Sequence, residues 1–294
     1  MVLDNKSIDK IKAFVYAKPR AINEIAQMLN KNWRTADRYV DEIKKRTGHI
    51  QTKTFREGSR GALKIAYWNN LEKIYSTDIQ EKLFKQIEKG IDKQDFSPIE
   101  IFQYVDADKR DGYFEEIKPD KKNKKYNEDY QYNVETLFPL IDNAKEEILI
   151  FIGTSSWIHL NYKDRTLFDA ILTAAKRGVL IQILTNVNLL DKENLRKVMS
   201  INTTLGKEQV MIRHEITPLR AYIIDKTVAK FSEIKVPKSK PGELQKTLGV
   251  YYAFYDEDWV EWIRQMFWKK FQLAVPAKSR LDALESLHAY KGLK

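Results

Sequence analysis

The sequence predicts a protein of mixed α/β class in two parts, a small basic N-terminal module and a larger C-terminal α/β sandwich domain. Within residues 1–69, three short helical patterns precede two strand patterns, which is typical of a compact α+β module. From residue 134 onward, continuous apolar strands alternate with amphipathic helices. That alternation indicates a largely parallel sheet covered on both faces.

The positive charge of the chain is concentrated at its start. The 294 residues carry a net charge of +10. Residues 1–69 contain fifteen lysines and arginines against seven aspartates and glutamates, a net charge of +8, which leaves only +2 for the rest of the chain. A compact basic module on a nearly neutral body favours a polyanionic partner for that module.

Signals of several other protein classes are absent from the sequence. It has no cysteine, which excludes a disulfide framework, a thiolate zinc site and a cysteine nucleophile. It has no signal-peptide core and no apolar run of about 18 residues, so we expect a cytoplasmic protein without a membrane partner. It also lacks a Walker loop, a dinucleotide glycine fingerprint and an HExxH motif, so we expect no cofactor and no metal.

The first module, residues 1–69, begins with three helical patterns. We expect the first helix to start at Ser7 and end before Pro19, and the third to start after Asn32 and close at Gly48. The second lies between them, after which Asn30 begins a turn. The residues expected to face inward are Ile8, Ile11, Phe14, Val15, Ile22, Ile25, Met28, Leu29, Ala36, Tyr39, Val40 and Ile43.

Two strand-like runs, 49–56 and 62–68, follow the third helix and are joined by a turn that contains Gly58 and Gly61. Three helices followed by a basic-tipped hairpin resemble a winged helix-turn-helix domain. Such a domain places its third helix in the major groove of duplex DNA and its wing beside the flanking backbone. The expected contacts are Asn32, Trp33, Arg34, Thr35, Arg38 and Lys45 on the helix, and Lys53, Arg56, Ser59, Arg60 and Lys64 on the wing.

Two interpretations of this module remain open. Trp33 either stacks on the sugar-phosphate edge of DNA or closes the start of the helix as a hydrophobic staple. Winged helices also serve as protein-interaction modules, here within a transcription or repair complex, although a basic groove-facing surface favours DNA.

Residues 70–100 are expected to form a helical linker, with Leu83, Phe84 and Ile87 among its apolar positions. Such a helix either makes the contact of a homodimer, which would pair two recognition helices, or packs on its own chain. After it, 99–105 is a weak strand pattern. The lysine-rich run 117–128 is expected to be an exposed loop.

The remaining domain is expected to span 101–280 and to be followed by a polar tail, 281–294. Helical patterns occur at 134–144, 167–177 and 258–274, and strand patterns at 146–153, 179–186, 209–214, 220–225, 227–231 and 249–256. We expect the strands at 209–214 and 220–225 to pair as a hairpin. This order of elements resembles the phospholipase D superfamily fold. With the winged helix, nearly the whole chain resembles archaeal winged-helix proteins of the TrmB type, whose phospholipase D-like domain is degenerate.

The catalytic pattern of that superfamily is His-x-Lys, four further residues and Asp, with the histidine as nucleophile. Anchoring the pattern on Asp225 places Pro218 at the histidine position and Arg220 at the lysine position, so we expect no enzymatic activity. His214 is the only histidine nearby. The alternative function is therefore a phosphodiesterase or nuclease that uses His214 in an unorthodox role.

Arg213, His214 and Arg220, with Thr154, Ser155 and Ser156 after the first strand, could form an anion or effector pocket in the degenerate site. The interpretation that we favour is that Arg220 pairs with Asp225 or Glu215 and the domain serves dimerisation. The sequence thus predicts a homodimeric protein that binds double-stranded DNA, either as a transcription regulator or as a nucleoid-associated protein. A small-molecule effector is left open.

Overall fold

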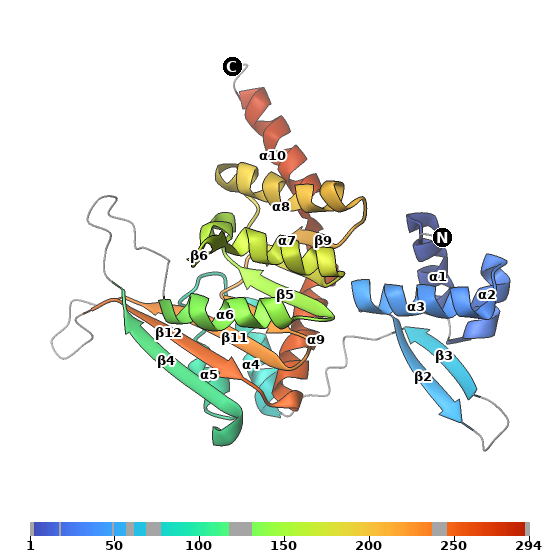
Figure 1. The fold of residues 1–294 in the computed structure, drawn as a ribbon, viewed down its shortest axis with the longest axis horizontal. Helices are drawn as coiled ribbons and strands as arrows, with labels where there is room; N and C mark the ends of the chain where they lie inside the picture. Colours follow the sequence, from blue (N-terminus) through green and yellow to red (C-terminus); the bar gives the residue numbers. More distant parts are fainter. Residues whose placement is uncertain are drawn as a thin grey trace. The chain divides into compact units, whose positions relative to one another are not determined.

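The computed structural model describes residues 3–17, 19–48, 50–56, 62–68, 78–117, 131–236 and 246–291. The chain divides into two compact units, Met1–Ile74 and Tyr75–Lys294 (Figure 1). The linker expected at 70–100 is not a separate body, because the helix within it, α4 (Asp78–Lys89), belongs to the second unit.

The first unit is a winged helix, as expected. It contains α1 (Asn5–Ala17), α2 (Ile22–Leu29) and α3 (Trp33–Thr47), followed by the hairpin of β2 (Ile50–Arg56) and β3 (Ala62–Trp68). A two-residue strand that the sequence did not reveal, β1 (Arg20–Ala21), pairs with β3 and completes a three-stranded antiparallel sheet in the order β1-β3-β2. The core of the unit lies between the three helices and this sheet.

Side-chain caps set the limits of these helices. The Asn32 side chain accepts a hydrogen bond from the Thr35 N–H at 2.8 Å, and Gly48 ends α3 in the left-handed region with φ 65°. At α1 the expected cap was wrong. Asp4, not Ser7, caps the helix, because the Ser7 N–H donates to the Asp4 carboxylate at 2.7 Å and already lies in the first turn.

The second unit is built on an eight-stranded mixed sheet with the order β13-β9-β8-β5-β10-β11-β12-β4. Within this sheet, β5 pairs with β8 and β8 with β9 in parallel, and the other pairs are antiparallel. The prediction of a largely parallel sheet was therefore wrong. The strands are β4 (Arg110–Glu116), β5 (Glu147–Ile152), β8 (Leu180–Thr185), β9 (Val210–His214), β10 (Ala221–Ile224), β11 (Val228–Lys235), β12 (Leu248–Phe254) and β13 (Val275–Pro276).

The expected hairpin of 209–214 and 220–225 is not formed. β9 pairs in parallel with β8, whereas β10 pairs antiparallel with β5 and β11. After β9 the chain therefore passes across β8 and β5 before it enters the sheet again. This crossover separates Arg213 and His214, at the end of β9, from Arg220, which precedes β10.

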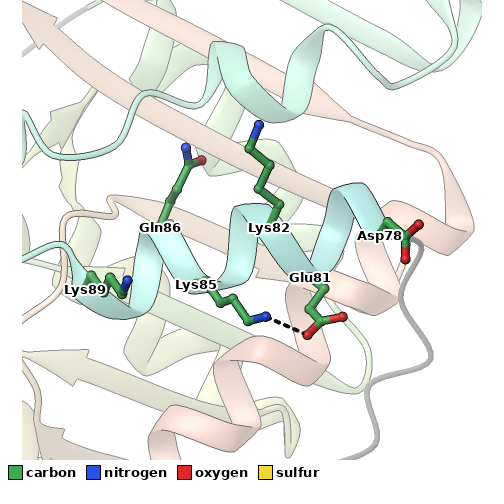
Figure 2. Close-up of a pocket in the computed structure, with 6 residues that line it drawn as sticks. All are labelled: Asp78, Glu81, Lys82, Lys85, Gln86 and Lys89. Atoms are coloured by element: carbon green, nitrogen blue, oxygen red, sulfur yellow. Dashed lines mark ion pairs between the residues drawn. The ribbon is translucent and has the colours of Figure 1, made fainter.

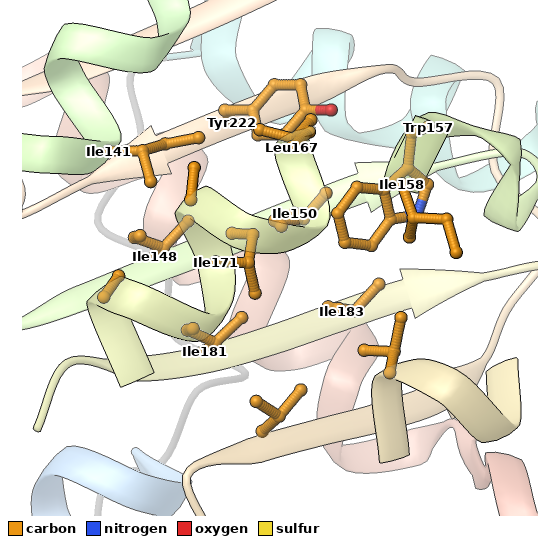
Figure 3. Packing of buried hydrophobic residues seen from close by; sticks show 14 of the residues in the cluster. Ile141, Ile148, Ile150, Trp157, Ile158, Leu167, Ile171, Ile181, Ile183 and Tyr222 are labelled. Carbon is orange, nitrogen blue, oxygen red and sulfur yellow. The ribbon is translucent and has the colours of Figure 1, made fainter. Parts of the chain in front are cut away.

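Helices cover both faces of this sheet. α6 (Gln131–Asn143), α7 (Leu167–Arg177) and α8 (Lys192–Leu205) pack on the face that presents Ile148 and Ile150 of β5 (Figure 3). On the opposite face, Phe151 contacts Phe267 of α9 (Glu257–Leu273), with ring centroids 5.0 Å apart. The alternation of β5 side chains thus divides the core into two layers.

Two further segments differ from the sequence prediction. The run 99–105, read as a weak strand, begins with a short helix, α5 (Ile99–Phe102). The expected polar tail is part of a helix, α10 (Ala277–Lys291), whose Leu281 is buried in the main core. Within the described residues, no helix is long and apolar enough to cross a membrane.

The apolar side of α4 packs within the second unit. Leu83, Phe84 and Ile87 are buried, and the Lys269 ammonium of α9 lies 4.2 Å from the centre of the Phe84 ring. The outward side is polar and borders a hollow of about 330 Å³, where Glu81 and Lys85 form an ion pair at 2.8 Å (Figure 2). Of the two roles left open for this segment, the structure supports packing on its own chain.

Candidate nucleic-acid interface

The outer side of α3 carries a basic stripe. Arg34, Arg38 and Lys45 are all exposed. At about 100° per residue, these three positions lie within roughly 40° of one another around the helix axis. The stripe is turned away from the residues of α3 that enter the core, which are Ala36, Tyr39, Val40 and Ile43. α3 therefore presents guanidinium and ammonium groups along one exposed line.

At the start of α3, one side chain caps the helix and the next is exposed to solvent. The Asn32 side-chain oxygen is occupied by its capping bond to Thr35, so the cap is structural whatever else Asn32 contacts. Trp33 is 44% exposed at the first position of the helix. This exposure leaves much of the Trp33 ring open for stacking, one of the two roles left open for it.

Lys64 has a different role from the one expected. Its ammonium lies 2.6 Å from a carboxylate oxygen of Asp37 and 3.0 Å from one of Asp41, both on α3. Partial burial works to lower the pKa of Lys64, but the hydrogen bonds to Asp37 and Asp41 outweigh it and the pKa is raised. Since its charge is neutralised by α3, we no longer count Lys64 among the DNA contacts.

The other predicted wing contacts fall at the limit of the described structure. Ser59 and Arg60 lie in the turn 57–61, outside the described residues. The backbones of Lys53 and Arg56 belong to β2, and their side chains are not described. These four contacts stay predictions.

In the second unit, Arg220 lines a small pocket of about 40 Å³ beyond the carboxyl end of β5. Hydroxyl groups of Thr154, Ser156 and Ser232 and the amide of Asn133 line the same pocket. The Arg220 Nε is buried, and in the described part of the chain the guanidinium has no hydrogen-bond or ion-pair partner. A cation, three hydroxyls and an amide make a set of donors suited to an oxyanion.

Lys93 adds a second cation close to this pocket. A Cβ added to Gly153, which lines the pocket, would lie 3.1 Å from the Lys93 Cε and 3.5 Å from its Nζ. Lys93 and Asn133 were missed in the sequence because they are 127 and 87 positions from Arg220, and no local pattern links them.

The other three residues predicted for this pocket lie elsewhere. Ser155 is buried, and its N–H points to Asp191. The Arg213 guanidinium donates to the carbonyl of Phe271 at 2.9 Å and to two further carbonyls at the end of α9. The His214 Nδ1 accepts a hydrogen bond from the Val187 N–H at 3.0 Å. Of the predicted residues, the pocket contains Arg220, Thr154 and Ser156. The crossover after β9 keeps Arg213 and His214 away from it, and Ser155 is buried beside it.

The environment of His214 disfavours the charged form of its imidazole. Burial lowers its pKa, and the nearby guanidinium of Arg280 lowers it further. The neutral ring accepts the Val187 hydrogen bond through Nδ1, a role that protonation would abolish.

Two of the residues at positions of the catalytic pattern, Pro218 and Asp225, are used for folding. Pro218, at the histidine position, is buried against Gly90, where an added Cβ would come within 2.8 Å of its Cγ. Asp225 accepts hydrogen bonds from the N–H groups of Lys145, Glu146 and Glu147 at 2.6, 2.7 and 3.0 Å. Glu215 pairs with Lys270 at 2.9 Å. The expected pairing of Arg220 with Asp225 or Glu215 is therefore not observed.

The three-dimensional structure is similar to that of TrmBL2, described as an archaeal chromatin protein with a novel mode of DNA binding. The similarity covers 93% of this chain and 94% of that one, at 16% identity and a TM-score of 0.40. NucT from Helicobacter pylori is similar over 57% of this chain and 99% of its own, at 15% identity and a TM-score of 0.37. Nuc from Salmonella typhimurium, a phospholipase D family member, is similar over 57% of this chain and 97% of its own, at 12% identity and a TM-score of 0.38. No family model and no curated protein matches the sequence.

The predicted combination of an N-terminal winged helix with a larger α/β domain is confirmed by the structure. Among the described residues, no cluster of His, Asp or Glu has the arrangement of a metal site.

Proposed function

We propose that this protein binds double-stranded DNA through its winged helix, with α3 in the major groove. The observation that carries the proposal is the exposed stripe of Arg34, Arg38 and Lys45 on a helix whose acidic neighbours Asp37 and Asp41 are paired with Lys64. An α-helix fits the major groove, where arginine binds phosphates and guanine edges. The net charge of +8 in residues 1–69 adds long-range attraction to DNA.

The proposal includes a nucleoid location and a role either in transcription regulation or in coating DNA. A homodimer would place two α3 helices on successive major grooves. Since the apolar side of α4 is already buried within its own unit, a second copy would have to pair through another surface. A genome-wide occupancy map separates the two roles, because discrete promoter peaks indicate a regulator and broad coverage indicates an architectural protein.

The salt dependence of duplex binding tests the proposal directly. Each phosphate contact contributes about −0.9 to the slope of log K against log salt. Arg34→Ala/Arg38→Ala is therefore expected to make this slope shallower by about two and to weaken binding to all sequences. The measurement is fluorescence anisotropy of a labelled duplex titrated at salt concentrations from about 50 to 300 mM.

Lys6→Ala/Lys10→Ala is the matched control, because it removes two exposed charges of the same unit from α1. The control is expected to keep nearly the full slope. An equal loss in both double variants would contradict the assignment to α3. Absence of binding by the wild-type protein at the lowest salt would contradict DNA binding itself.

A second function is supported by the buried Nε of Arg220, which has no hydrogen-bond partner among the described residues. We propose that its pocket binds a small oxyanion, such as phosphate or a phosphate monoester, as an effector. A cation that is partly buried without a partner is unfavourable, and an anion held by Arg220 and the surrounding hydroxyls would relieve that cost.

Thermal unfolding of the second unit tests this site. Inorganic phosphate is expected to raise the unfolding temperature of the wild type and not of Arg220→Met, which should itself be at least as stable as the wild type without phosphate. Arg34→Met is the control, since it removes the same charge from the other unit. An equal response to phosphate in all three proteins would contradict the site.

We propose that this pocket binds without hydrolysis. Pro218 offers no nucleophile, the His214 ring nitrogen is engaged with Val187, and His159 lies 3.0 Å from Asn194 in a separate contact. Phosphodiesterase activity that is lost in His214→Ala would contradict this view. If the wild-type protein shows no affinity for DNA but captures a stoichiometric protein partner, the protein-interaction alternative is favoured.

A further inference from the structure

The eight-stranded sheet of the second unit ends in a long edge strand. β4 is seven residues long and pairs with β12 on one side (Figure 1). On its other side, no strand of the described chain pairs with it. The opposite edge of the sheet is formed by β13, which has only two residues, one of them a proline. Short strands and prolines protect an edge against further pairing, so β4 is the edge that is open to a partner.

The hydrogen bonds to β12 show which backbone groups of β4 point outward. Before β4, the Tyr255 N–H donates to the Lys109 carbonyl at 2.8 Å. After β4, the Ile117 N–H donates to the Thr247 carbonyl at 2.9 Å. In an antiparallel pair, such residues alternate along the strand with residues whose N–H and C=O groups point away from the partner. The groups on the open side of β4 are therefore those of Arg110, Gly112, Phe114 and Glu116.

The centre of this open edge is uncharged and aromatic. Gly112, Tyr113 and Phe114 separate two charged ends, and β4 contains neither lysine nor proline, the residues that commonly prevent edge pairing. The Phe114 side chain is 65% exposed and that of Tyr113 is 45% exposed. The outward Gly112 N–H donates only to the carboxylate of its own neighbour, Asp111, at 2.8 Å. Both the rings and the backbone of this edge would gain from pairing with another strand.

β4 is complementary to a second copy of itself in one antiparallel register. When Tyr113 lies opposite Tyr113 of the second copy, every outward residue lies opposite another outward residue, so the N–H and C=O groups of the two edges pair. Arg110 then faces Glu116 of the second copy. These opposite charges offset the contact between Asp111 and Glu115 that the same register creates.

Gly112 leaves room for Phe114 in this register. A Cβ added to Gly112 would lie 3.4 Å from the Phe102 ring of α5, so this ring covers β4 where β4 has no side chain. Phe114 of one copy lies opposite Gly112 of the other, on the face that carries Phe102. The two phenylalanine rings therefore pack side by side, and the contact occurs twice around the two-fold axis.

We propose that two copies of this chain pair edge to edge through β4, antiparallel and with Tyr113 on the two-fold axis, so that their sheets join into one. The inference rests on the homodimer included in the proposed function and names its surface. It depends neither on DNA affinity nor on the Arg220 pocket. Backbone hydrogen bonds supply the pairing, and the match of Phe114 with Gly112 sets its register.

Cysteine crosslinking of the full-length protein tests the register, because the chain has no cysteine of its own. Tyr113→Cys places two thiols at directly opposed positions whose Cα atoms lie about 4.5 Å apart, within the range of a disulfide. This variant is expected to form a covalent dimer rapidly with copper–phenanthroline as oxidant. Phe114→Cys would place the thiols on a diagonal of about 7–8 Å and is expected to crosslink much more slowly. Leu190→Cys, at a side chain that is 98% exposed in the same unit, measures crosslinking by random collision.

Sedimentation equilibrium of the full-length protein without DNA measures the association itself. The wild type is expected to be a dimer. Phe114→Lys removes the ring and adds a charge at the centre of the edge, so it is expected to weaken dimerisation by about tenfold or more. Leu190→Lys is the matched control, since it makes the same change of charge at an exposed apolar side chain of the same unit and should keep the wild-type affinity. Crosslinking of Tyr113→Cys tests the surface even if Phe114→Lys does not fold.

Three results would overturn the proposal. They are a monomeric wild type, equal weakening of the dimer in the two lysine variants, and crosslinking of Tyr113→Cys no faster than that of Phe114→Cys or Leu190→Cys. A monomeric wild type that binds duplex DNA would keep the proposed DNA binding and leave this edge to a strand of another protein. A dimer that crosslinks through Tyr113→Cys without affinity for DNA would support this surface and contradict the proposed function.

Discussion

The Lys64 ammonium of β3 lies 2.6 Å from a carboxylate oxygen of Asp37 on α3, so an ion pair ties the wing to the proposed recognition helix. Asp41 approaches the same ammonium at 3.0 Å. This arrangement neutralises the acidic groups next to the basic stripe and also fixes the sheet against α3. Its loss should therefore affect stability first and DNA contact only indirectly.

Lys64→Met is expected to lower the free energy of unfolding of the first unit by about 1 kcal/mol, because it leaves Asp37 and Asp41 without their shared partner. The slope of log K against log salt for DNA binding should change by less than the contribution of one phosphate contact, about 0.9. Chemical denaturation and anisotropy titrations measure the two effects. Lys45→Met, at an exposed position of α3, is the reciprocal control and should weaken DNA binding without loss of stability. The reverse pattern would contradict the assigned roles.

Loss of a buried ion pair in the second unit is expected to be more destabilising than loss of the Lys64 pair. Arg264 on α9 and Glu147 at the start of β5 form an ion pair with side chains only 11% and 6% exposed. Burial works to lower the pKa of Arg264, but Glu147 outweighs it and the pKa is raised. Arg264→Met is expected to destabilise this unit by about 3–5 kcal/mol, because it strands the Glu147 carboxylate in the core.

The double variant Arg264→Met/Glu147→Met should recover most of that loss, since neither charge then remains buried. Urea unfolding of the two single variants and the double variant completes the cycle. A destabilisation of Arg264→Met below about 1 kcal/mol would show that the pair is hydrated in solution.

Lys230 gives the stability of the second unit a specific pH dependence. Burial lowers the pKa of this β11 lysine to about 8, against a small opposing effect of Asp111, and its ammonium donates to the Thr136 hydroxyl. The unfolded chain keeps this proton up to a pH near its ordinary pKa of 10.5. Between these two values unfolding takes up a proton, so raising the pH favours the folded state.

The free energy of unfolding of the wild type, measured relative to Lys230→Met, is expected to rise by about 2 kcal/mol between pH 8 and 10. Urea titrations at several pH values measure this difference. Tyr252 acts in the opposite direction above pH 10, because burial and its hydrogen bond to Glu233 raise its pKa. The comparison is therefore made below that pH. A constant difference between the two proteins would show that Lys230 is solvated.

Much of the fold follows from local sequence signals. The caps at Asn32 and Gly48, the apolar face of α3 and the apolar strand β5 are all evident from residue types a few positions apart. The same holds for the glycine that ends α7 at 178. Where one short-range pattern decides a structure, the sequence is sufficient.

The wrong predictions concern segments whose structure is decided by pairing with distant parts of the chain. β9 and β10 are separated by six residues and look like a hairpin, yet β9 gains a parallel partner in β8 and β10 an antiparallel one in β5. The two-residue strand β1 exists only because β3 offers it an edge. For the same reason the Arg220 pocket could not be assembled correctly, since Asn133 and Lys93 approach it only through tertiary packing.

Asp225 is held at its position by folding. It begins the turn between β10 and β11 with φ 48°, and its carboxylate binds three N–H groups at the start of β5. A chain of this architecture would keep the aspartate under selection for a properly joined sheet, whether or not it ever cleaved a phosphodiester. When related genomes are searched for hydrolases, this aspartate therefore carries little information. Positions 218 and 220, where the catalytic pattern needs a histidine and a lysine, are the informative ones.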